Sequence, residues 1–206
     1  EEMMRETRAY RQQVRARGTQ RTRERLLGAA RERFLGDHYD AVRLADIAHD
    51  AGTTTQTLHA HFGDKATLFE EVARLLSAEL AADRATVPAG DVSALVATLV
   101  RGYERFGDAN WRVVASEDRV PKAAELLHGA RREHRAWLVA TLEQHLPPQP
   151  EQRTAVLDAL YAATDVGTWK LLRRDLRLSK ARTAAAMRTL VHGALLARDE
   201  TEEVST

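Results

Sequence analysis

Cysteine is absent from this chain of 206 residues, and aromatic residues make up only 5% of it. Without cysteine the protein forms no disulfide, carries no thiol nucleophile and offers no thiolate to a metal, as is typical of a reducing cytoplasm. No run approaches the roughly 18 uninterrupted apolar residues of a membrane span, and the first residues lack the apolar core of a secretory signal. The sequence therefore predicts a soluble, cytoplasmic protein that does not contact a membrane.

Catalytic motifs are missing too. The eight histidines include no pair spaced by four residues, the spacing that places two metal ligands on one face of a helix. The chain has no Gly-rich phosphate loop, no Gly-x-Ser-x-Gly elbow and no serine in the setting of a nucleophile. We therefore expect no catalytic residues, no metal site and no cofactor, in a protein that is not an enzyme.

The alternation of apolar and polar residues that marks a strand is missing as well, whereas apolar residues recur at helical spacing almost throughout. Hydrophobic residues amount to 44% and charged residues to 30%, enough for a core and a hydrated surface. The expected fold class is all-α, with about nine helices. Helices are expected at 20–34, 44–51, 54–62, 65–83, 121–145, 151–173 and 179–198, with another that Asp91 caps and that runs to about Phe106, and a short piece at 110–116 after Gly107.

Positive charge is concentrated near the N-terminus. Between residues 5 and 33 the chain has ten arginines and only three acidic residues. Such a block is typical of polyanion binding, although arginine is frequent throughout this chain. Arg8, Arg11 and Arg15 would align along one side of a helix over 7–17, where they could follow a DNA backbone or enter a minor groove. A disordered extension with nonspecific charge is the alternative.

Residues 44–62 have the spacing of two short helices that cross closely. Ala48 is small enough for the two backbones to approach, Gly52 accepts a positive φ in the turn, and Ile47 and Leu58 supply the apolar contacts. This is the pattern of a helix-turn-helix, whose second helix enters the major groove of DNA. That helix is expected at 54–61.

The side chains of this second helix suit DNA recognition. Thr54 can cap the helix, which leaves backbone N–H groups directed toward a phosphate. The Gln56 amide can pair with an adenine, and a threonine methyl can contact a thymine. The alternative is a solvated, threonine-rich turn. The residues of this helix that we expect to face DNA are Thr54, Thr55, Gln56, Thr57 and His59.

Further motifs surround the helix-turn-helix. They are Phe34 and Tyr39 at the end of the first helix, Asp46-Ile47-Ala48, Ala51-Gly52, Thr57-Leu58 and His61-Phe62-Gly63-Asp64-Lys65. With these motifs, residues 21–68 resemble the DNA-binding domain of the TetR family of bacterial transcriptional regulators. The resemblance is strong over about a quarter of the chain. A segment just before the last helix is also similar to many family members. It reads Trp169-Lys170-Leu171-Leu172-Arg173-Arg174-Asp175-Leu176.

The resemblance implies a division into domains. A basic extension at 1–19 precedes a three-helix helix-turn-helix DNA-binding domain at 20–66. A helical ligand-binding and dimerisation domain follows at 67–206. On this resemblance the protein binds double-stranded DNA.

Individual DNA contacts follow from the same resemblance. It implies that Lys65 contacts a phosphate and that Thr57 and His59 face the DNA. Three positions depart from the family pattern: His59 replaces a usual tyrosine, Gln56 a small residue, and Arg43 a serine or threonine that caps a helix. We expect Arg43 to bind a phosphate in place of the cap, and Gln56 to add base readout.

The second half of the chain carries most of the aromatic residues. Pockets for small molecules are mostly apolar with a few placed polar groups, so this cluster predicts a site for an effector of unknown class. A cation would be favoured if Asp165 were buried among aromatic rings. A plain hydrophobic core is the alternative. The predicted ligand-binding residues are Tyr103, Phe106, Trp111, His134, Trp137, Tyr161, Asp165 and Trp169, with Asn110 as polar company.

The resemblance also implies a homodimer in which the last two long helices form a four-helix bundle with their twofold mates. Small residues let such helices approach, and a dimer lets two recognition helices reach major grooves about 34 Å apart. The predicted contact residues are Ala155, Leu157, Leu160, Ala163 and Leu171 on one helix, and Ala186, Leu190, Ala194 and Ala197 on the other.

These features together predict a ligand-responsive transcriptional regulator. The favoured form is a repressor that binds a palindromic operator as a dimer and is released by a small-molecule effector. The alternative is a DNA-binding regulator without a small-molecule ligand, controlled by a protein partner. A second half with no cavity would favour that alternative.

Overall fold

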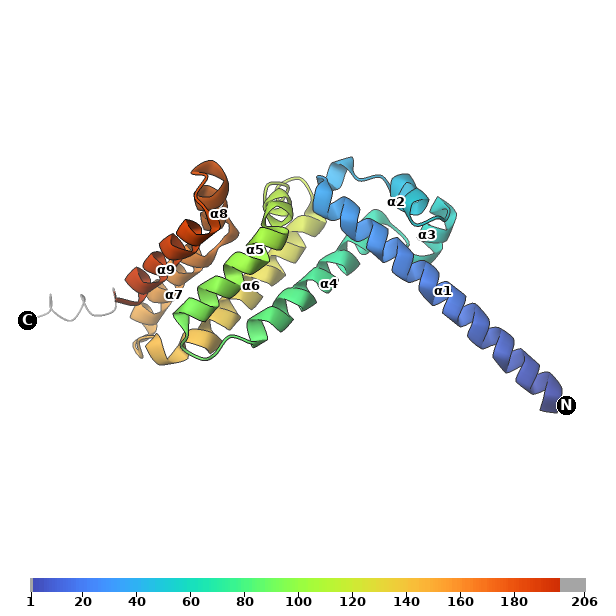
Figure 1. The fold of residues 1–206 in the computed structure, drawn as a ribbon, viewed down its shortest axis with the longest axis horizontal. Coiled ribbons are helices and arrows are strands. Elements are labelled where there is room, and N and C mark those ends of the chain that lie inside the picture. Colours follow the sequence, from blue (N-terminus) through green and yellow to red (C-terminus); the bar gives the residue numbers. More distant parts are fainter. Residues whose placement is uncertain (1, 197–206) are drawn as a thin grey trace, which may run out of the picture. The chain divides into compact units, whose positions relative to one another are not determined.

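The computed structural model describes residues 2–196, with side chains described from Val14 onward. Every regular element in this range is helical, which confirms the all-α fold. None of the helices in the range combines the length and the apolar character that a membrane span needs. The helices are α1 (Glu2–Gly36), α2 (Leu44–Asp50), α3 (Thr55–Phe62), α4 (Lys65–Ala85), α5 (Val92–Val114), α6 (Pro121–Leu142), α7 (Pro150–Thr164), α8 (Val166–Lys170) and α9 (Lys180–Leu196) (Figure 1).

The chain consists of two compact units, and the boundary between them lies inside α4, between Leu75 and Leu76. The first unit contains α1 to α3 and the first half of α4. The second contains the rest of α4 and the helices that follow. The division lies further along the chain than the boundary after residue 66 that the sequence suggests, and the extent of the functional domains stays a prediction.

The first unit is built around the predicted helix-turn-helix. Ile47 and Leu58 are fully buried, and Ala48 is 1% exposed where α2 and α3 pack together. The chain turns at Gly52 with a φ of 62°, as predicted, a conformation that glycine adopts without steric cost. The other helices complete this core with Leu26, Ala30 and Phe34 from α1, and Leu68, Phe69 and Val72 from α4.

Helix α1 is much longer than the predicted helix at 20–34. It runs unbroken from Glu2 to Gly36 and includes the range 7–17, because no proline interrupts it and an internal glycine such as Gly18 costs only about 1 kcal/mol. The side chains at positions 14–21 are all exposed. The side chains of Arg8 and Arg11 lie outside the described part.

Part of the basic block has a structural role. Arg23 forms a salt bridge with Glu71 and lies over the Phe62 ring, 4.7 Å from its centroid. Arg33 pairs with Asp50 at 2.7 Å. These two arginines tie α1 to its neighbours and are therefore engaged within the unit. The exposed arginines of α1 with described side chains are Arg15, Arg17, Arg21 and Arg25.

The second unit is a helical bundle around its own apolar core. α5 starts where predicted, because the Asp91 carboxylate accepts the Ala94 N–H at 2.8 Å. α7 packs against α9, and α5 packs against α6, α8 and α9 (Figure 1). The largest side chains buried in this unit are Trp169, Leu95, Leu138, Leu142, Leu160 and Met187.

Helix α5 continues through Gly107 to Val114, so the predicted break and the separate piece at 110–116 are wrong. A Cβ atom at Gly107 would lie closer than 3.0 Å to three atoms of the Trp169 ring. This glycine therefore provides room for a tryptophan and does not stop the helix.

The predicted helix at 151–173 is divided in the structure. α7 ends at Thr164, Asp165 adopts an extended conformation (φ −70°, ψ 152°), and α8 begins at Val166. Asp165 Oδ1 accepts the Gly167 N–H at 2.7 Å and so caps α8. Asp165 therefore lies outside α7, the helix that carries Tyr161. A π-helical turn follows at Leu171–Asp175.

The predicted contact face on α7 is partly wrong. Leu157 and Leu160 are buried in the core of their own unit, as is Ala163. The small residues that this helix exposes lie on its other side, because the side with the two leucines packs into the core. They are Ala155, Ala159 and Ala162.

The predicted contact face on α9 is only partly exposed. On α9, Leu190 is 47% exposed and Gly193 is exposed. Ala186 and Ala194 are half-buried, and Ala197 lies outside the described residues.

Candidate functional site

The predicted recognition helix, α3, starts directly after Thr54. Thr54 Oγ1 accepts the backbone N–H of Thr57 at 3.2 Å and lies 3.0 Å from the Thr57 hydroxyl. This bond satisfies one of the N–H groups that the start of a helix leaves free, and it confirms the predicted cap. The first turn of α3, with Thr55 and Gln56, is thereby fixed.

Exposure distinguishes the polar residues of α3. Gln56 and His59 are exposed, whereas Thr55 and Thr57 are half-buried. Leu58 is fully buried and fixes the rotation of the helix about its axis. The amide and the imidazole are therefore the groups that α3 presents most fully to its surroundings.

His59 uses one of its ring nitrogens inside the unit. Its Nδ1 lies 2.5 Å from the carbonyl oxygen of Gly63, which can only accept, so Nδ1 carries the proton and donates. In the neutral ring Nε2 is then a bare acceptor. A hydrogen bond donated by His59 to a DNA phosphate would therefore need the imidazolium form, which alone has a second N–H.

Replacing His59 by tyrosine is therefore expected to raise DNA affinity. A phenol hydroxyl keeps its proton at pH 8 and can donate, and a hydrogen bond to a charged phosphate contributes about 1.5 kcal/mol, or roughly tenfold in affinity. Fluorescence anisotropy with a labelled duplex at pH 8 measures the change. His59→Phe has the same ring without the hydroxyl, and equal affinities of the two variants would contradict the assignment.

Arg43 and Lys65 flank the recognition helix. Arg43 is exposed, and its side chain makes no cap for α2. Lys65 begins α4, with Nζ 4.5 Å from the centroid of the Tyr39 ring. Burial lowers the pKa of Lys65, and the charge of Asp40 partly opposes this shift. A cation held over an aromatic face is oriented before any phosphate arrives.

Comparison with known proteins agrees with this geometry. Residues 26–72 match the family model described as bacterial regulatory proteins, tetR family. The matched segment is similar to this family in sequence. A TetR-family protein is a DNA-binding transcriptional regulator, and the matched segment contains all of α2 and α3. A search of curated proteins gives no match.

Solved structures of other TetR-family regulators share this fold. One from Streptomyces coelicolor has a TM-score of 0.70 at 19% identity, over 89% of this chain and 85% of that chain. One from Mesorhizobium loti MAFF303099 has a TM-score of 0.62 at 19% identity, over 87% of this chain and 97% of that chain. At this identity the likeness establishes the fold of this chain.

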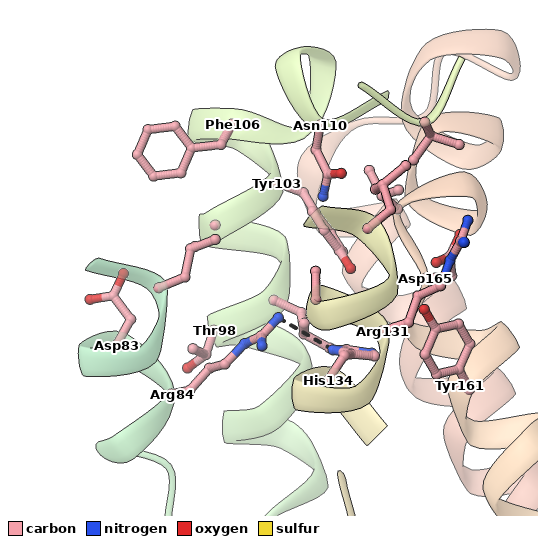
Figure 2. A pocket seen from close by; sticks show the side chains of 17 residues that line it. Asp83, Arg84, Thr98, Tyr103, Phe106, Asn110, Arg131, His134, Tyr161 and Asp165 are labelled. Carbon is pink, nitrogen blue, oxygen red and sulfur yellow. Dashed lines mark hydrogen bonds between the residues drawn. The ribbon is translucent and has the colours of Figure 1, made fainter. Parts of the chain in front are cut away.

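The second unit contains a cavity of about 130 Å³. The end of α4, the middle of α5 and α6, and the junction of α7 with α8 surround it (Figure 2). Five of the eight predicted ligand-binding residues line the cavity, and so does Asn110. These five are Tyr103, Phe106, His134, Tyr161 and Asp165.

The three tryptophans of the predicted set do not line the cavity. Trp169 is fully buried in the core, where its Nε1 donates to Glu104. Trp111 lies beneath the ammonium of Lys170, and Trp137 beneath the guanidinium of Arg84. The three tryptophans therefore lie outside the lining of the cavity. Their assignment as ligand contacts stays a prediction, and this geometry does not support it.

His134 is the centre of a directed hydrogen-bond chain. The Arg84 guanidinium can only donate, so its 3.3 Å contact makes His134 Nδ1 an acceptor. His134 Nε2 therefore carries the proton and donates to Thr164 Oγ1 at 2.8 Å, and that hydroxyl donates to the Leu160 carbonyl at 2.7 Å. The Tyr103 hydroxyl donates to the Thr164 carbonyl at 2.7 Å. This chain fixes the neutral form of the imidazole.

This environment makes stability depend on pH. Burial, and secondarily the charge of Arg84, lower the pKa of His134 to about 3. The unfolded chain takes up the proton near pH 6.5, so the stability from neutral His134 is complete above that pH and is lost as pH falls toward 3. Between pH 7 and pH 5 we expect a loss of about 2 kcal/mol from this group.

Urea unfolding at pH 7 and pH 5 measures this loss. His134→Gln has no titrating group, so its stability should fall less between the two pH values. The same fall in the variant and the wild type would show that His134 does not cause it.

Arg84 and Thr98 are among the cavity residues that sequence reasoning missed. Arg84 belongs to the end of α4, and Thr98 to a face of α5 that reads as apolar, so neither stands out by spacing or composition. Both enter the cavity because helices distant in sequence bring them together, in contacts that no local pattern records. Figure 2 shows the Arg84 side chain extending to His134, with Thr98 also in the lining.

Proposed function

We propose that this TetR-family regulator is a homodimeric repressor that a small molecule releases from its operator. The observation that carries the proposal is the cavity of about 130 Å³ in the second unit, in a chain whose first unit contains a segment that matches the tetR family. A regulator controlled only by a protein partner has no need of such a cavity. The cavity therefore favours the ligand-responsive form.

The DNA-contacting roles are assigned from exposure and chemistry. Exposed Gln56 contributes base readout in the major groove, with Thr55 and Thr57 in support. Arg43 and Lys65 bind phosphates on either side of the recognition helix. The exposed arginines of α1 add contacts with the DNA backbone that do not depend on sequence.

Dimerisation is assigned to the exposed faces of α7 and α9. Ala155, Ala159 and Ala162 form a stripe of small residues on α7. On α9, Leu190 is 47% and Leu196 is 66% exposed. Large apolar side chains exposed beside small ones are typical of a surface that another helix pair covers.

Helix α4 provides the coupling between ligand and DNA. It is continuous from Lys65 to Ala85 and contributes to both compact units. Arg84, near its end, lines the cavity, and Lys65, at its start, is the proposed phosphate contact. A ligand that favours one position of α4 in the dimer changes the spacing of the two recognition helices, and the change in DNA affinity equals its preference for that position.

Sedimentation of the full chain with a bound duplex tests the dimeric reader. Two chains per duplex are expected, and Ala159→Arg should give single chains with much weaker binding. Ala136→Arg adds the same charge at an exposed position of α6 and should remain dimeric. One chain per duplex in the wild type would contradict the proposal.

A further inference from the structure

The cavity contains one cation without an acidic partner. The guanidinium of Arg84 lies 4.9 Å from the centroid of the Trp137 ring and donates to His134 Nδ1. Among the described residues no carboxylate lies within salt-bridge distance of it. Guanidinium has five N–H donors, and a neutral imidazole accepts only one of them.

The other cation of the lining is already paired. Arg131 forms two hydrogen bonds with Glu117, at 2.6 and 2.7 Å, and this contact is the largest cause of its raised pKa. Of the two carboxylates, Asp83 Oδ2 accepts from Arg105 at 3.0 Å, and Asp165 Oδ1 accepts the Gly167 N–H that begins α8. Arg84 is thus the cation of the lining that a ligand can still neutralise.

Burial makes the isolated charge of Arg84 costly. It lowers the pKa of this guanidinium, and the more weakly acting Tyr103, Glu133 and Tyr161 only partly oppose the shift. Removing a charge from water without a counter-ion is unfavourable, and an anion in the cavity relieves that cost. His134 cannot serve as the counter-ion because it is neutral or positive.

A second donor lies beside Arg84. Thr98 is 6% exposed, and its Oγ1 accepts from Arg101 at 2.9 Å. No described residue accepts the hydroxyl proton of Thr98 within hydrogen-bond distance. Figure 2 shows Thr98 next to the Arg84 side chain on the same side of the cavity. A buried hydroxyl with a free proton next to a guanidinium is suited to one carboxylate.

The remaining walls are apolar and the space is small. Leu99, Phe106, Val114 and Leu127 line it. A dry apolar cavity of about 150 Å³ holds one benzene molecule, so about 130 Å³ admits a single ring or a short branched chain. We propose that the cavity binds a small aromatic or branched monocarboxylate, with its carboxylate held by Arg84 and Thr98. This inference rests on the proposed function and names the class of its effector.

Titration calorimetry with three probes of the same size tests the charge of the ligand. Benzoate is anionic, benzamide neutral and benzylamine cationic. In the wild-type chain benzoate should bind at least 30-fold more tightly than benzamide, because charge-assisted hydrogen bonds to a partly buried guanidinium are among the strongest. Benzylamine should bind least. Equal or tighter binding of benzamide or benzylamine would overturn the proposal.

Variants locate the effect. Arg84→Met should make the affinities for benzoate and benzamide equal, and Thr98→Val should weaken benzoate alone about fivefold. Arg132→Met removes an exposed arginine from α6 and should change neither affinity. Circular dichroism checks that each variant folds, and Arg84→Lys, which keeps the charge, should keep most of the preference for benzoate. A preference that survives in Arg84→Met would overturn the assignment of Arg84.

The outcomes separate this inference from the function on which it rests. Preferred binding of the neutral or cationic probe leaves an effector site in place and rejects only the carboxylate. Binding of none of the three probes rejects both the carboxylate and the cavity as an effector site. Binding to duplex DNA is measured independently of either result.

Discussion

Replacing Gly107 by alanine is expected to lower the free energy of unfolding by about 3 kcal/mol. The new Cβ would come closer than 3.0 Å to Cζ3, Cη2 and Cε3 of Trp169. That ring cannot move aside easily, because it is fully buried and its Nε1 donates to Glu104 at 3.3 Å. The Arg174 guanidinium covers it at 4.7 Å, and the Tyr103 ring lies 5.7 Å away.

Gly129→Ala is the matched control. Gly129 also lies inside a helix, α6, but a Cβ there meets nothing within 4 Å. Alanine should therefore stabilise the helix by up to about 1 kcal/mol. Urea unfolding followed by circular dichroism compares the two variants, and Trp169→Phe should recover part of the loss in Gly107→Ala, since the ring atoms in the way are removed. Equal stability of the two alanine variants would contradict the packing account.

Replacing Gln56 by glutamate is expected to lower DNA affinity by about 2 to 3 kcal/mol, roughly 30- to 150-fold. Gln56 is exposed in the first turns of α3, so the substitution should leave the fold unchanged. In the complex its new carboxylate would stand in the major groove between two phosphate backbones and would have lost the amide N–H donors that pair with a base.

Ala136→Glu controls for net charge. It adds the same negative charge at an exposed position of the second unit. Anisotropy titrations over a series of salt concentrations should show little change for this variant. A loss of affinity in Ala136→Glu equal to that in Gln56→Glu would mean that α3 has no special position on the DNA.

The parts of the fold that depend on neighbouring residues could be predicted from the sequence. Ala48, Gly52 and Leu58 act within one short motif, so their spacing predicted the crossing of α2 and α3. The caps at Thr54 and Asp91 are equally local, since each side chain bonds to an N–H three residues on. These features are decided before any distant helix is packed.

The failures arise where distant residues decide the outcome. Gly107 resembles a helix stop until Trp169 packs on it, and Asp165 resembles a helical residue until it caps α8. The phase of α7 depends on which side faces the core, and a stripe of Leu and Ala does not specify that side. Arg84 gains its importance from His134 and Thr98, which lie on two other helices.

Candidate DNA contacts could be named from the sequence more readily than candidate ligand contacts, for the same reason. Gln56, His59 and Lys65 lie within one continuous segment that a family pattern spans. The cavity is assembled from four separate regions of the chain. Aromatic composition located it approximately, but Trp111, Trp137 and Trp169 do not line it, and their role as ligand contacts stays a prediction.

The most direct test of the central claim is selection of bound duplexes from a random library by the full wild-type chain, with sequencing of the bound fraction. An inverted repeat should be enriched, with two half-sites placed for two recognition helices in successive major grooves. Lys65→Ala should enrich the same repeat with lower affinity and a shallower salt dependence, whereas Gln56→Ala should lose preference at particular bases of each half-site. Enrichment of no sequence by the wild-type chain, or of an identical repeat by Gln56→Ala, would contradict the account.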